Sequence, residues 1–564
     1  MNDKKKIIAS MLRFDGVSEQ EIYELITVPA DAKNGDYCLP CFKLAKALRK
    51  SPVVIAQDAA GSLTCLPPPF KKVEAVNGYL NFFVDTALCA EAVLTEIEKK
   101  GHDYGSSSEG EGKAVCIDYS SINIAKPFHI GHLCTTVIGG ALYRIYKKLG
   151  YNAVGINHLG DWGTQFGKLI VAFKKWSNEE RLNELGMQEL TSIYVRYHTE
   201  AETDPTLDDQ ARAWFKKIED GDKEALRLYN LFKEITLREV DKTYKRLKIS
   251  FDSYNGEAFY NDKMQPVIDE LTEKGLLVED KGAKIVDLSE EGMPPCLIVK
   301  ADGATLYATR DLAAAYYRKK TYDFYKSLYV VAYQQNLHFR QIFKVLEKLG
   351  KDWAKDCVHV AFGMVSMESG AMSTRKGKVI YLEDVLNKAV ERSLEIITEK
   401  NPQLENKEAT AEMVGVGAVI FSVLYNNRIK DIIFSYDKVL NFDGETGPYV
   451  QYTNARCLSV LNKVGECAAT PDFSAVDNPE GQAVVSLLER FPDVLREAVE
   501  KYEPCYVGRF LVDLCQSYNR FYLAHRIMGE EEGVKKARAM LTDAVHIVIE
   551  EGLRLMGIDA PKKM

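Results

Sequence analysis

Apolar residues follow two different periods along this chain. Residues 115–120 (VCIDYS) and 152–157 (NAVGIN) are short apolar runs, which are typical of buried strands. Between them, apolar positions at helical spacing predict a helix over about 133–149, and Gly150 suits its C-terminal stop. A strand, a helix and a second strand predict a parallel sheet that binds ligands at the carboxyl ends of its strands.

The same alternation returns at 327–333 (SLYVVAY), 341–350 (QIFKVLEKLG) and 358–365 (VHVAFGMV). The stretch 174–250 is charged and helical, and beyond about residue 385 the strand signals fade into long helical patterns. Near the start, 42–50 (FKLAKALRK) predicts a helix, 78–85 (GYLNFFVD) a strand, and 101–113 a linker. We therefore expect an α/β protein with an α+β N-terminal part and an all-α C-terminal part.

Composition narrows the class of protein. The 564 residues are 46% hydrophobic and 27% charged, which is ordinary for a globular chain of several domains. A formal net charge of −8 excludes nucleic-acid binding through a diffuse basic field, so local patches would have to bind such a partner. The sequence shows no membrane span and no signal peptide, and we expect a cytoplasmic protein.

Twelve cysteines are spread along the chain, and Cys38 and Cys41 form the one close pair, in CLPC. A zinc ribbon needs a second pair or histidines at ligand spacing, and neither is present. We interpret these cysteines as small apolar residues of a reduced protein, and we expect no metal site.

A candidate phosphate site follows the first predicted strand, in SSINIAKPFHIGHL at 120–133. His129, Gly131 and His132 stand at the start of a helix, where free backbone N–H groups and the helix dipole favour an anion. Lys126 adds a mobile charge just before them. A second basic segment at 366–378 (SMESGAMSTRKGK) is suited to closing over phosphates, with a solvated surface loop as the alternative.

Several blocks resemble class I aminoacyl-tRNA synthetases, and within that class the arginyl-tRNA synthetases. HIGH at 129–132 and MSTRKG at 372–377 are similar to the paired ATP-binding motifs of the class. Blocks similar to the arginyl family run along nearly the whole chain, at 35–46, 157–169, 302–313, 334–341, 447–456 and 555–564.

The resemblance implies a ligase that joins arginine to the α-phosphate of ATP, releases pyrophosphate and passes the arginyl group to the 3′-terminal ribose of tRNA. It implies an N-terminal tRNA-elbow-binding domain at 1–108, a Rossmann-type catalytic domain at 112–435 and a helical anticodon-binding domain at 436–564. Mg²⁺ would arrive bound to ATP, and arginine activation would require tRNA. No separate cofactor is implied, and we expect a monomer.

The resemblance also implies roles for individual residues. The catalytic group is His129, His132 and Lys126. The ATP contacts are Gly131, both histidines, Met372, Ser373, Thr374, Arg375 and Lys376. The arginine contacts are Asp118, Asn123, Glu257, Tyr307, Asp311 and Gln335, with His158, Asp161 and Gln165 lining the pocket. The tRNA contacts are Tyr79, Asn81, Tyr518, Arg520 and Arg526.

Alternatives stay open for the motif lysines, for Asp311 and for the function of the whole chain. Ala371 and Thr374 replace the two lysines of the class motif, so Lys126 is implied as a substitute, and a share for Arg375 or Lys376 stays open. For Asp311, the alternative to substrate binding is a salt bridge with a neighbouring arginine. For the whole chain, the alternatives are a class I synthetase for another amino acid and a catalytically silent tRNA-binding paralogue.

Overall fold

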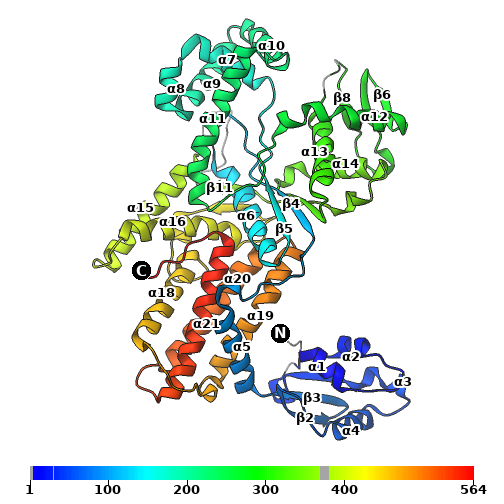
Figure 1. Cartoon of the computed structure of the whole chain (residues 1–564), viewed down its shortest axis with the longest axis vertical. Helices are drawn as coiled ribbons and strands as arrows, with labels where there is room; N and C mark the ends of the chain where they lie inside the picture. The colour runs from blue at the N-terminus through cyan, green and yellow to red at the C-terminus, as the bar shows by residue number, and fades with distance from the viewer. Residues whose placement is uncertain (1–3, 30, 127, 302, 304, 369–379) are drawn as a thin grey trace. The chain divides into compact units, whose positions relative to one another are not determined.

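The computed structural model describes residues 4–29, 31–126, 128–301, 303, 305–368 and 380–564 (Figure 1). The chain divides into two compact units. The smaller unit comprises Met1–Tyr104, Val460–Glu489 and Gln516–Ile547, and the larger comprises Gly105–Ser459, Arg490–Cys515 and Val548–Met564. Helices α19 (Pro479–Glu500), α20 (Cys505–Ala524) and α21 (Glu532–Met556) contribute residues to both units. The boundaries expected near 108 and 436 stay predictions.

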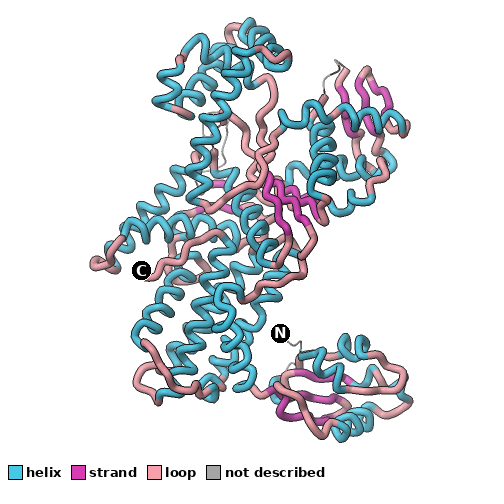
Figure 2. The backbone as a smooth tube through the Cα atoms, viewed as in Figure 1, coloured by secondary structure: helices cyan, strands magenta, loops and turns pink. Residues whose placement is uncertain are grey.

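The larger unit contains a four-stranded parallel sheet (Figure 2). Its strands are β4 (Ala114–Asp118), β5 (Asn152–Ile156), β9 (Lys326–Tyr329) and β10 (Cys357–His359), in the order β10–β9–β4–β5. Every residue of β4 is buried, as expected for a central parallel strand. The predicted βαβ units are confirmed, with α6 (Leu133–Lys148) between β4 and β5 and α14 (Asn336–Lys348) between β9 and β10.

The strand order indicates where a ligand binds. β4 comes first in the chain, yet it lies between β5 and β9, to which it is hydrogen-bonded on either side. Connections leave in opposite directions from this point, and in such sheets we expect ligands outside the carboxyl ends of the strands that flank it, here β4 and β9. The predicted histidine motif follows β4 directly.

Two groups of elements are inserted between β5 and β9 (Figure 1). The first confirms the charged helical stretch and comprises α7 (Gln165–Trp176), α8 (Glu179–Leu185), α9 (Met187–Ala201), α10 (Thr206–Glu219) and α11 (Lys223–Arg246). The second comprises α12 (Gln265–Glu273), α13 (Tyr307–Tyr322) and an antiparallel sheet of β6 (Leu277–Asp280), β7 (Ala283–Val286) and β8 (Cys296–Val299). This sheet was not predicted, because its four-residue strands are too short for a clear period.

Helices dominate the later part of the chain. They are α15 (Leu382–Lys400), α16 (Lys407–Leu424), α17 (Tyr436–Val439) and α18 (Gly447–Val464), followed by α19–α21. One prediction is wrong here: strand β12 (Ile432–Phe434) lies beyond residue 385 and pairs in parallel with β11 (Val365–Met367). Three residues carry no readable periodicity.

The N-terminal part of the smaller unit packs helices on an antiparallel sheet of order β1–β3–β2. The elements are α1 (Lys4–Met11), α2 (Glu19–Leu25), β1 (Tyr37–Pro40), α3 (Ala45–Leu48), α4 (Pro52–Ser62), β2 (Phe70–Val76), β3 (Tyr79–Val84) and α5 (Thr86–Lys100). Strand β3 is confirmed. The helix predicted over 42–50 shortens to α3, because Arg49 takes a left-handed conformation with φ 51° and ends it. Cys38 and Cys41 are buried, in agreement with the interpretation as small apolar residues.

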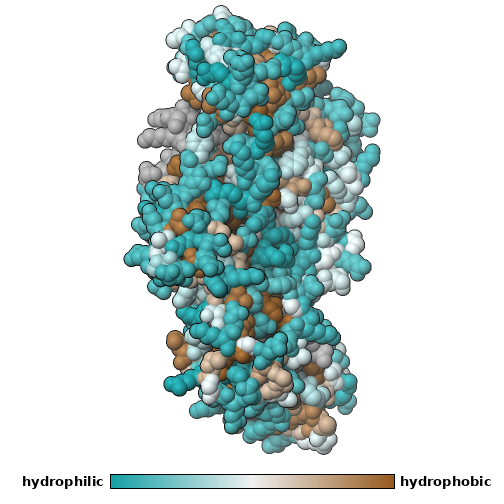
Figure 3. Space-filling model, turned by 60° about the vertical axis from the view of Figure 1, so that its left-hand side comes forward, coloured by the Kyte–Doolittle hydropathy of each residue, from teal (hydrophilic) through white to brown (hydrophobic). Residues whose placement is uncertain are grey.

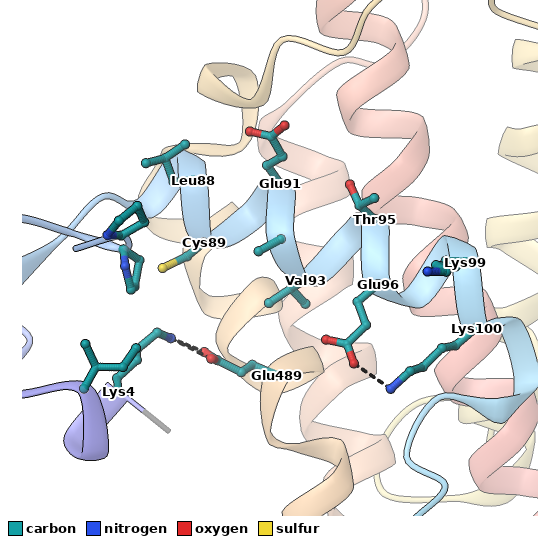
Figure 4. Close-up of a pocket in the computed structure, with 14 residues that line it drawn as sticks. Lys4, Leu88, Cys89, Glu91, Val93, Thr95, Glu96, Lys99, Lys100 and Glu489 are labelled. Carbon is teal, nitrogen blue, oxygen red and sulfur yellow. Dashed lines mark hydrogen bonds and ion pairs between the residues drawn. The ribbon is translucent and has the colours of Figure 1, made fainter. Parts of the chain in front are cut away.

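A cavity of about 740 Å³ lies in the smaller unit, beside α1 and α5 (Figure 4). Lys4 and Glu489 form an ion pair in it, with Nζ and Oε2 2.5 Å apart. None of the predicted site residues lines this cavity, so the candidate chemistry lies elsewhere.

The view in Figure 3 shows a surface that is mainly hydrophilic, with hydrophobic residues in separate small groups. Within the described residues, no helix has both the length and the apolar character that a membrane crossing requires. The same residues hold no group of three or more His, Cys, Asp or Glu side chains placed to bind a metal ion.

Candidate active site

Two histidines lie side by side where the loop after β4 enters helix α6. A 3₁₀ turn, η4 (Ile130–His132), begins the helix, and His129 caps it. The His129 Nδ1 accepts a hydrogen bond from the Gly131 N–H at 3.1 Å, and the His132 Nδ1 accepts one from the His129 N–H at 3.2 Å. The two ring centroids are 4.0 Å apart. The backbone thus locks both rings in one orientation.

Burial and the hydrogen bonds to Nδ1 together determine the protonation state and tautomer of both rings. Burial lowers the pKa of His129, and the nearby Lys126 charge lowers it further. Burial lowers the pKa of His132 to about 3, with the His129 charge as the next cause. Both rings are therefore neutral at pH 7. Since each Nδ1 accepts a hydrogen bond, each Nε2 carries the hydrogen and is a donor available to a ligand.

The loop before the histidines is strained. Ser120, Ser121 and Ala125 have φ values of 70°, 45° and 57°, a region that residues other than glycine rarely adopt. Helix α11 and the neighbouring structure hold this loop in place. The Ser120 hydroxyl is 2.7 Å from the Tyr244 hydroxyl, and the Ala125 N–H donates to Thr236 Oγ1 at 3.0 Å. Sequence reasoning missed both α11 residues, which lie more than 100 positions from the loop.

Lys126 is exposed in the same loop and lines a cavity of about 410 Å³ with Phe128 and Tyr381. Its charge contributes to the lowered pKa of both histidines, so the ammonium group lies near them. The expected ATP contacts Met372, Ser373, Thr374, Arg375 and Lys376 lie outside the described residues.

Asp118 ends β4 and forms a buried ion pair that the sequence did not predict. Arg318 of α13 donates from Nη2 to Asp118 Oδ2 at 2.7 Å, and the Ser121 hydroxyl donates to Oδ1 at 2.7 Å. The side chains of Arg318 and Asp118 are 1% and 9% exposed. Each carboxylate oxygen thus accepts one hydrogen bond from the protein, and a contact between Asp118 and the arginine substrate stays a prediction.

Glu257 begins the 3₁₀ turn η5 (Glu257–Lys263) and faces α13. Arg310 Nη1 is 3.3 Å from Glu257 Oε2. Burial raises the pKa of Glu257 to about 7, with the charges of Asp311 and Asp161 adding to the increase and Arg310 opposing it. This carboxyl group is therefore only partly ionised at neutral pH.

Asp311 follows Arg310 on α13, is hydrogen-bonded to His338 and lies near His158. His338 Nε2 lies 2.6 Å from Asp311 Oδ2, and His158 Nε2 lies 4.0 Å from Oδ1. Burial alone would raise the pKa of Asp311, but the hydrogen bond and charge of His338 hold it below the usual value. The alternative of a salt bridge with a neighbouring arginine is wrong, because Arg310 and Arg318 bind Glu257 and Asp118.

The other predicted arginine contacts surround this group. Tyr307 opens helix α13 one turn before Asp311, as the sequence predicted for a helical segment, and it is 65% exposed. Gln335 is exposed at the end of the 3₁₀ turn η7 (Tyr333–Gln335), beyond β9. Asn123 pairs with Gly160, where an added Cβ would lie 2.4 Å from the Asn123 Oδ1. A side chain at position 160 would therefore displace Asn123.

The three residues expected to line the pocket differ in their surroundings. His158 stacks on Tyr260, and its Nδ1 is buried without a hydrogen-bond partner among the described residues. Asp161 is buried and bound by Lys233 at 2.6 Å and by the Ala258 N–H at 2.9 Å, which makes it a support for the Glu257 segment. Gln165 Nε2 donates to the Gly160 carbonyl at 3.4 Å.

Some of the predicted tRNA contacts are exposed and others are buried. Tyr79, Arg520 and Arg526 are exposed, and the Tyr79 ring packs against Phe42 with centroids 5.2 Å apart. Asn81 is 3% exposed and Tyr518 is 0% exposed. Asn81 lies two residues after Tyr79, on the same face of β3, yet it is buried there, and Tyr518 is buried on α20. Their burial leaves little surface for a direct contact, and their role in tRNA binding stays a prediction.

Comparisons with known proteins agree along the whole chain. Three family models match: "Arginyl tRNA synthetase N terminal domain" at 3–84, "tRNA synthetases class I (R), catalytic domain" at 93–436 and "DALR anticodon binding domain" at 450–564. The chain is 52% identical over 568 residues to an arginine–tRNA ligase of Alkaliphilus metalliredigens and 50% identical over 565 residues to one of Clostridium beijerinckii, each covering 100% of both chains.

Solved structures give the same picture. The fold is similar to that of the arginyl-tRNA synthetase of Thermus thermophilus, with a TM-score of 0.81, 26% identity and 100% coverage of both chains. The arginyl-tRNA synthetase of Plasmodium falciparum shares the fold with a TM-score of 0.76 at 24% identity, covering 96% of this chain and 94% of that one.

Proposed function

The chain belongs to the arginyl-tRNA synthetase family, and from this premise we propose that its candidate active site ligates arginine to tRNA. The proposal depends on which residues lie together at the carboxyl edge of the parallel sheet. Two neutral imidazoles at the start of α6 lie at the same edge as two carboxyl groups, Glu257 and Asp311, whose surroundings suit a cation. The imidazoles at the helix start suit the anionic phosphates of ATP, and the carboxyl groups suit a cationic amino acid.

Adenylation needs positioning and charge neutralisation more than a covalent group on the protein. A carboxylate oxygen of arginine attacks the α-phosphorus of ATP, and the bond to the bridging oxygen breaks as pyrophosphate leaves with the electron pair. The His129 and His132 Nε2–H groups donate to the phosphate oxygens, and Lys126 adds a positive charge. Mg²⁺ enters bound to ATP, and residues 372–377 hold the pyrophosphate.

Arginine specificity follows from the carboxyl groups. A guanidinium presents five donors in one plane, and two carboxylates on α13 and η5 accept them from different sides. Tyr307 covers the alkyl chain, Asn123 and Gln335 bind the α-amino group, and Asp118 orients Arg318 behind the pocket. Lysine leaves these acceptors unpaired, and a site of this kind rejects such an analogue by about 10⁴-fold.

The second step transfers the arginyl group. A hydroxyl of the 3′-terminal ribose attacks the carbonyl carbon of the adenylate, and AMP leaves. Tyr79 contacts the elbow of tRNA, and Arg520 and Arg526 contact the anticodon arm. Activation of arginine depends on bound tRNA, and the protein acts as a cytoplasmic monomer.

Pyrophosphate exchange with each of the twenty amino acids, with and without total tRNA, tests this proposal. We expect exchange with arginine alone, and only when tRNA is present. Exchange with a different amino acid would overturn the specificity. Absence of exchange despite tRNA binding would favour the silent paralogue. Exchange without tRNA would contradict only the tRNA dependence.

A double variant tests the phosphate site separately. His129→Gln and His132→Gln together keep a polar group but lose the locked Nε2–H donors. We expect loss of adenylation with unchanged tRNA affinity in a filter-binding assay. Activity that survives in this double variant would contradict the role of the histidine pair.

A further inference from the structure

Arg310 connects the two segments that carry the predicted guanidinium acceptors. Its Nη1 lies 3.3 Å from Glu257 Oε2, and its Nη2 lies 3.4 Å from Asn261 Oδ1. Both partners belong to η5, whereas Arg310 and its neighbour Asp311 belong to α13. The Arg310 side chain therefore sets where Glu257 stands relative to Asp311.

The side chain is well placed to act as a fixed support. It is 9% exposed, so it cannot swing into solvent without opening the packing around it. Its Nε is buried without a hydrogen-bond partner in the described part of the chain. Arg318, on the same helix, contacts Asp118 at the shorter distance of 2.7 Å. A long contact such as the one between Arg310 and Glu257 is common in free enzymes and shortens when the substrate arrives.

Each predicted acceptor keeps one oxygen for a ligand. Arg310 contacts only Oε2 of Glu257, and among the described residues no group donates a hydrogen bond to Oε1. His338 binds Oδ2 of Asp311, while the His158 Nε2 lies 4.0 Å from Oδ1, beyond hydrogen-bond reach. The two open oxygens belong to neighbouring segments that Arg310 holds together.

We propose that Arg310 is a positioning residue for arginine recognition, which fixes the Glu257 carboxylate beside Asp311 and leaves its second oxygen for the guanidinium of the substrate. The inference rests on the proposed function, because it assigns Arg310 to the arginine pocket of that site. Arg310 does not itself contact the substrate. It selects arginine by presenting Glu257 in the right place and in its charged form.

The charged groups around Glu257 make the effect of Arg310 on its ionisation measurable. Arg310 faces it from α13 as a cation, while Asp311 on α13 and Asp161 after β5 face it as anions. Lys126 contributes a weaker positive influence from the loop after β4, and Lys233 of α11 is bound to Asp161. Loss of the Arg310 cation leaves two anions facing Glu257 and favours its protonated form.

The experiment compares Arg310→Gln and Arg310→Lys in tRNA-dependent pyrophosphate exchange between pH 6 and 9. For Arg310→Gln we expect the KM for arginine to rise roughly ten- to a hundredfold, the loss of one charge-assisted contact, with the KM for ATP unchanged. The acidic limb of kcat/KM for arginine should move to higher pH, because Glu257 then ionises later. Arg310→Lys keeps the cation and should restore the limb to the wild-type position.

Two controls separate this inference from other causes. Lys320→Gln removes an exposed cation from the same helix α13 and should change neither the KM nor the pH limb. Circular dichroism melting identifies any variant that fails to fold. A purely structural role for Arg310 would lower the folded fraction or kcat and leave the pH limb in place.

Glu257→Gln distinguishes failure of the inference from failure of the proposed site. If Glu257→Gln raises the KM for arginine but Arg310→Gln does not, Arg310 has no positioning role and the site proposal stands. If neither variant changes the KM for arginine, the arginine pocket itself is misplaced. A lower KM in Arg310→Gln would show competition with the substrate and would also overturn the inference.

Discussion

Burial has opposite consequences for the ionisable residues of this site. It lowers the pKa of both histidines at the α6 start, so that they act as neutral donors at pH 7. It also brings the pKa of Glu257 to about 7, where a small change of pH alters the charge of the pocket. The pH dependence of the reaction should therefore report the carboxyl group rather than the histidines.

We predict that kcat/KM for arginine falls about tenfold per pH unit below pH 7 and levels off above it. The raised pKa of Glu257 means that the protonated form is populated in the free protein at neutral pH. Only the ionised form offers the guanidinium a negative charge, so rising pH restores strong binding. Glu257→Gln should remove this limb. A flat profile between pH 5.5 and 8 would contradict the prediction.

Asp311→Asn tests the second predicted acceptor of the guanidinium, which is again a single residue. The change keeps the shape but loses a charge-assisted hydrogen bond of about 1.5–3 kcal/mol. The KM for arginine should rise while the KM for ATP stays nearly constant. Asp323→Asn, at the exposed end of the same helix, is the matched control and should have no effect. An equal rise for both substrates would remove Asp311 from the guanidinium pocket.

At the scale of elements, helix α6 carries the histidine pair at one end and a buried ion pair toward the other. Lys148 Nζ is 2.8 Å from Glu551 Oε1 of α21, and the two side chains are 5% and 2% exposed. Arg144, also on α6, donates from Nε to the Leu555 carbonyl at 2.8 Å. The helix that presents the phosphate site is therefore anchored within the larger unit by the last helix of the chain.

Removal of one partner of the buried pair should be costly. Glu551→Ala leaves Lys148 buried without its partner carboxylate, and we expect a loss of about 3–5 kcal/mol in urea unfolding. Glu224→Ala, which breaks an exposed pair with Lys174, should cost only about 0–1 kcal/mol. The double variant Lys148→Met with Glu551→Leu should recover most of the loss. Equal costs for the two single variants would contradict the importance of burial.

At the scale of the whole molecule, charge opposes the binding of a polyanion. The net charge is −8, and residues 436–564 hold 15 Lys and Arg against 20 Asp and Glu. Affinity for tRNA must therefore depend on a few exposed cations and on shape. Arg520 and Arg526 remain candidates because both are exposed.

We predict that Arg520→Gln with Arg526→Gln weakens tRNA binding and makes its salt dependence shallower. Each lost phosphate contact on a single strand should reduce the slope of log K against log salt by about 0.7. The KM for arginine should not change. Tyr518→Phe is the control, because this buried ring cannot stack on a base. An unchanged slope in the arginine double variant would place the anticodon contacts elsewhere.

The hydrophobic pattern by itself determined the parallel sheet, the helices that cross it and the position of the histidine motif at a strand end. Buried strands such as β4 and long amphipathic helices have a period that local sequence reveals. The same reasoning missed β6–β8 and β12, because strands of three or four residues are too short to show a period. It also did not reveal the burial of Asn81 and Tyr518, which depends on how their elements pack.

Only the tertiary structure decided how the charged residues pair. The sequence identified Asp118, Glu257 and Asp311 as acidic candidates through a family resemblance, yet their partners are Arg318, Arg310 and His338. Asp118 and Arg318 are 200 positions apart, and no local pattern links them. Residue type and period are properties of the chain, whereas burial, pairing and pKa arise from neighbours that folding brings together.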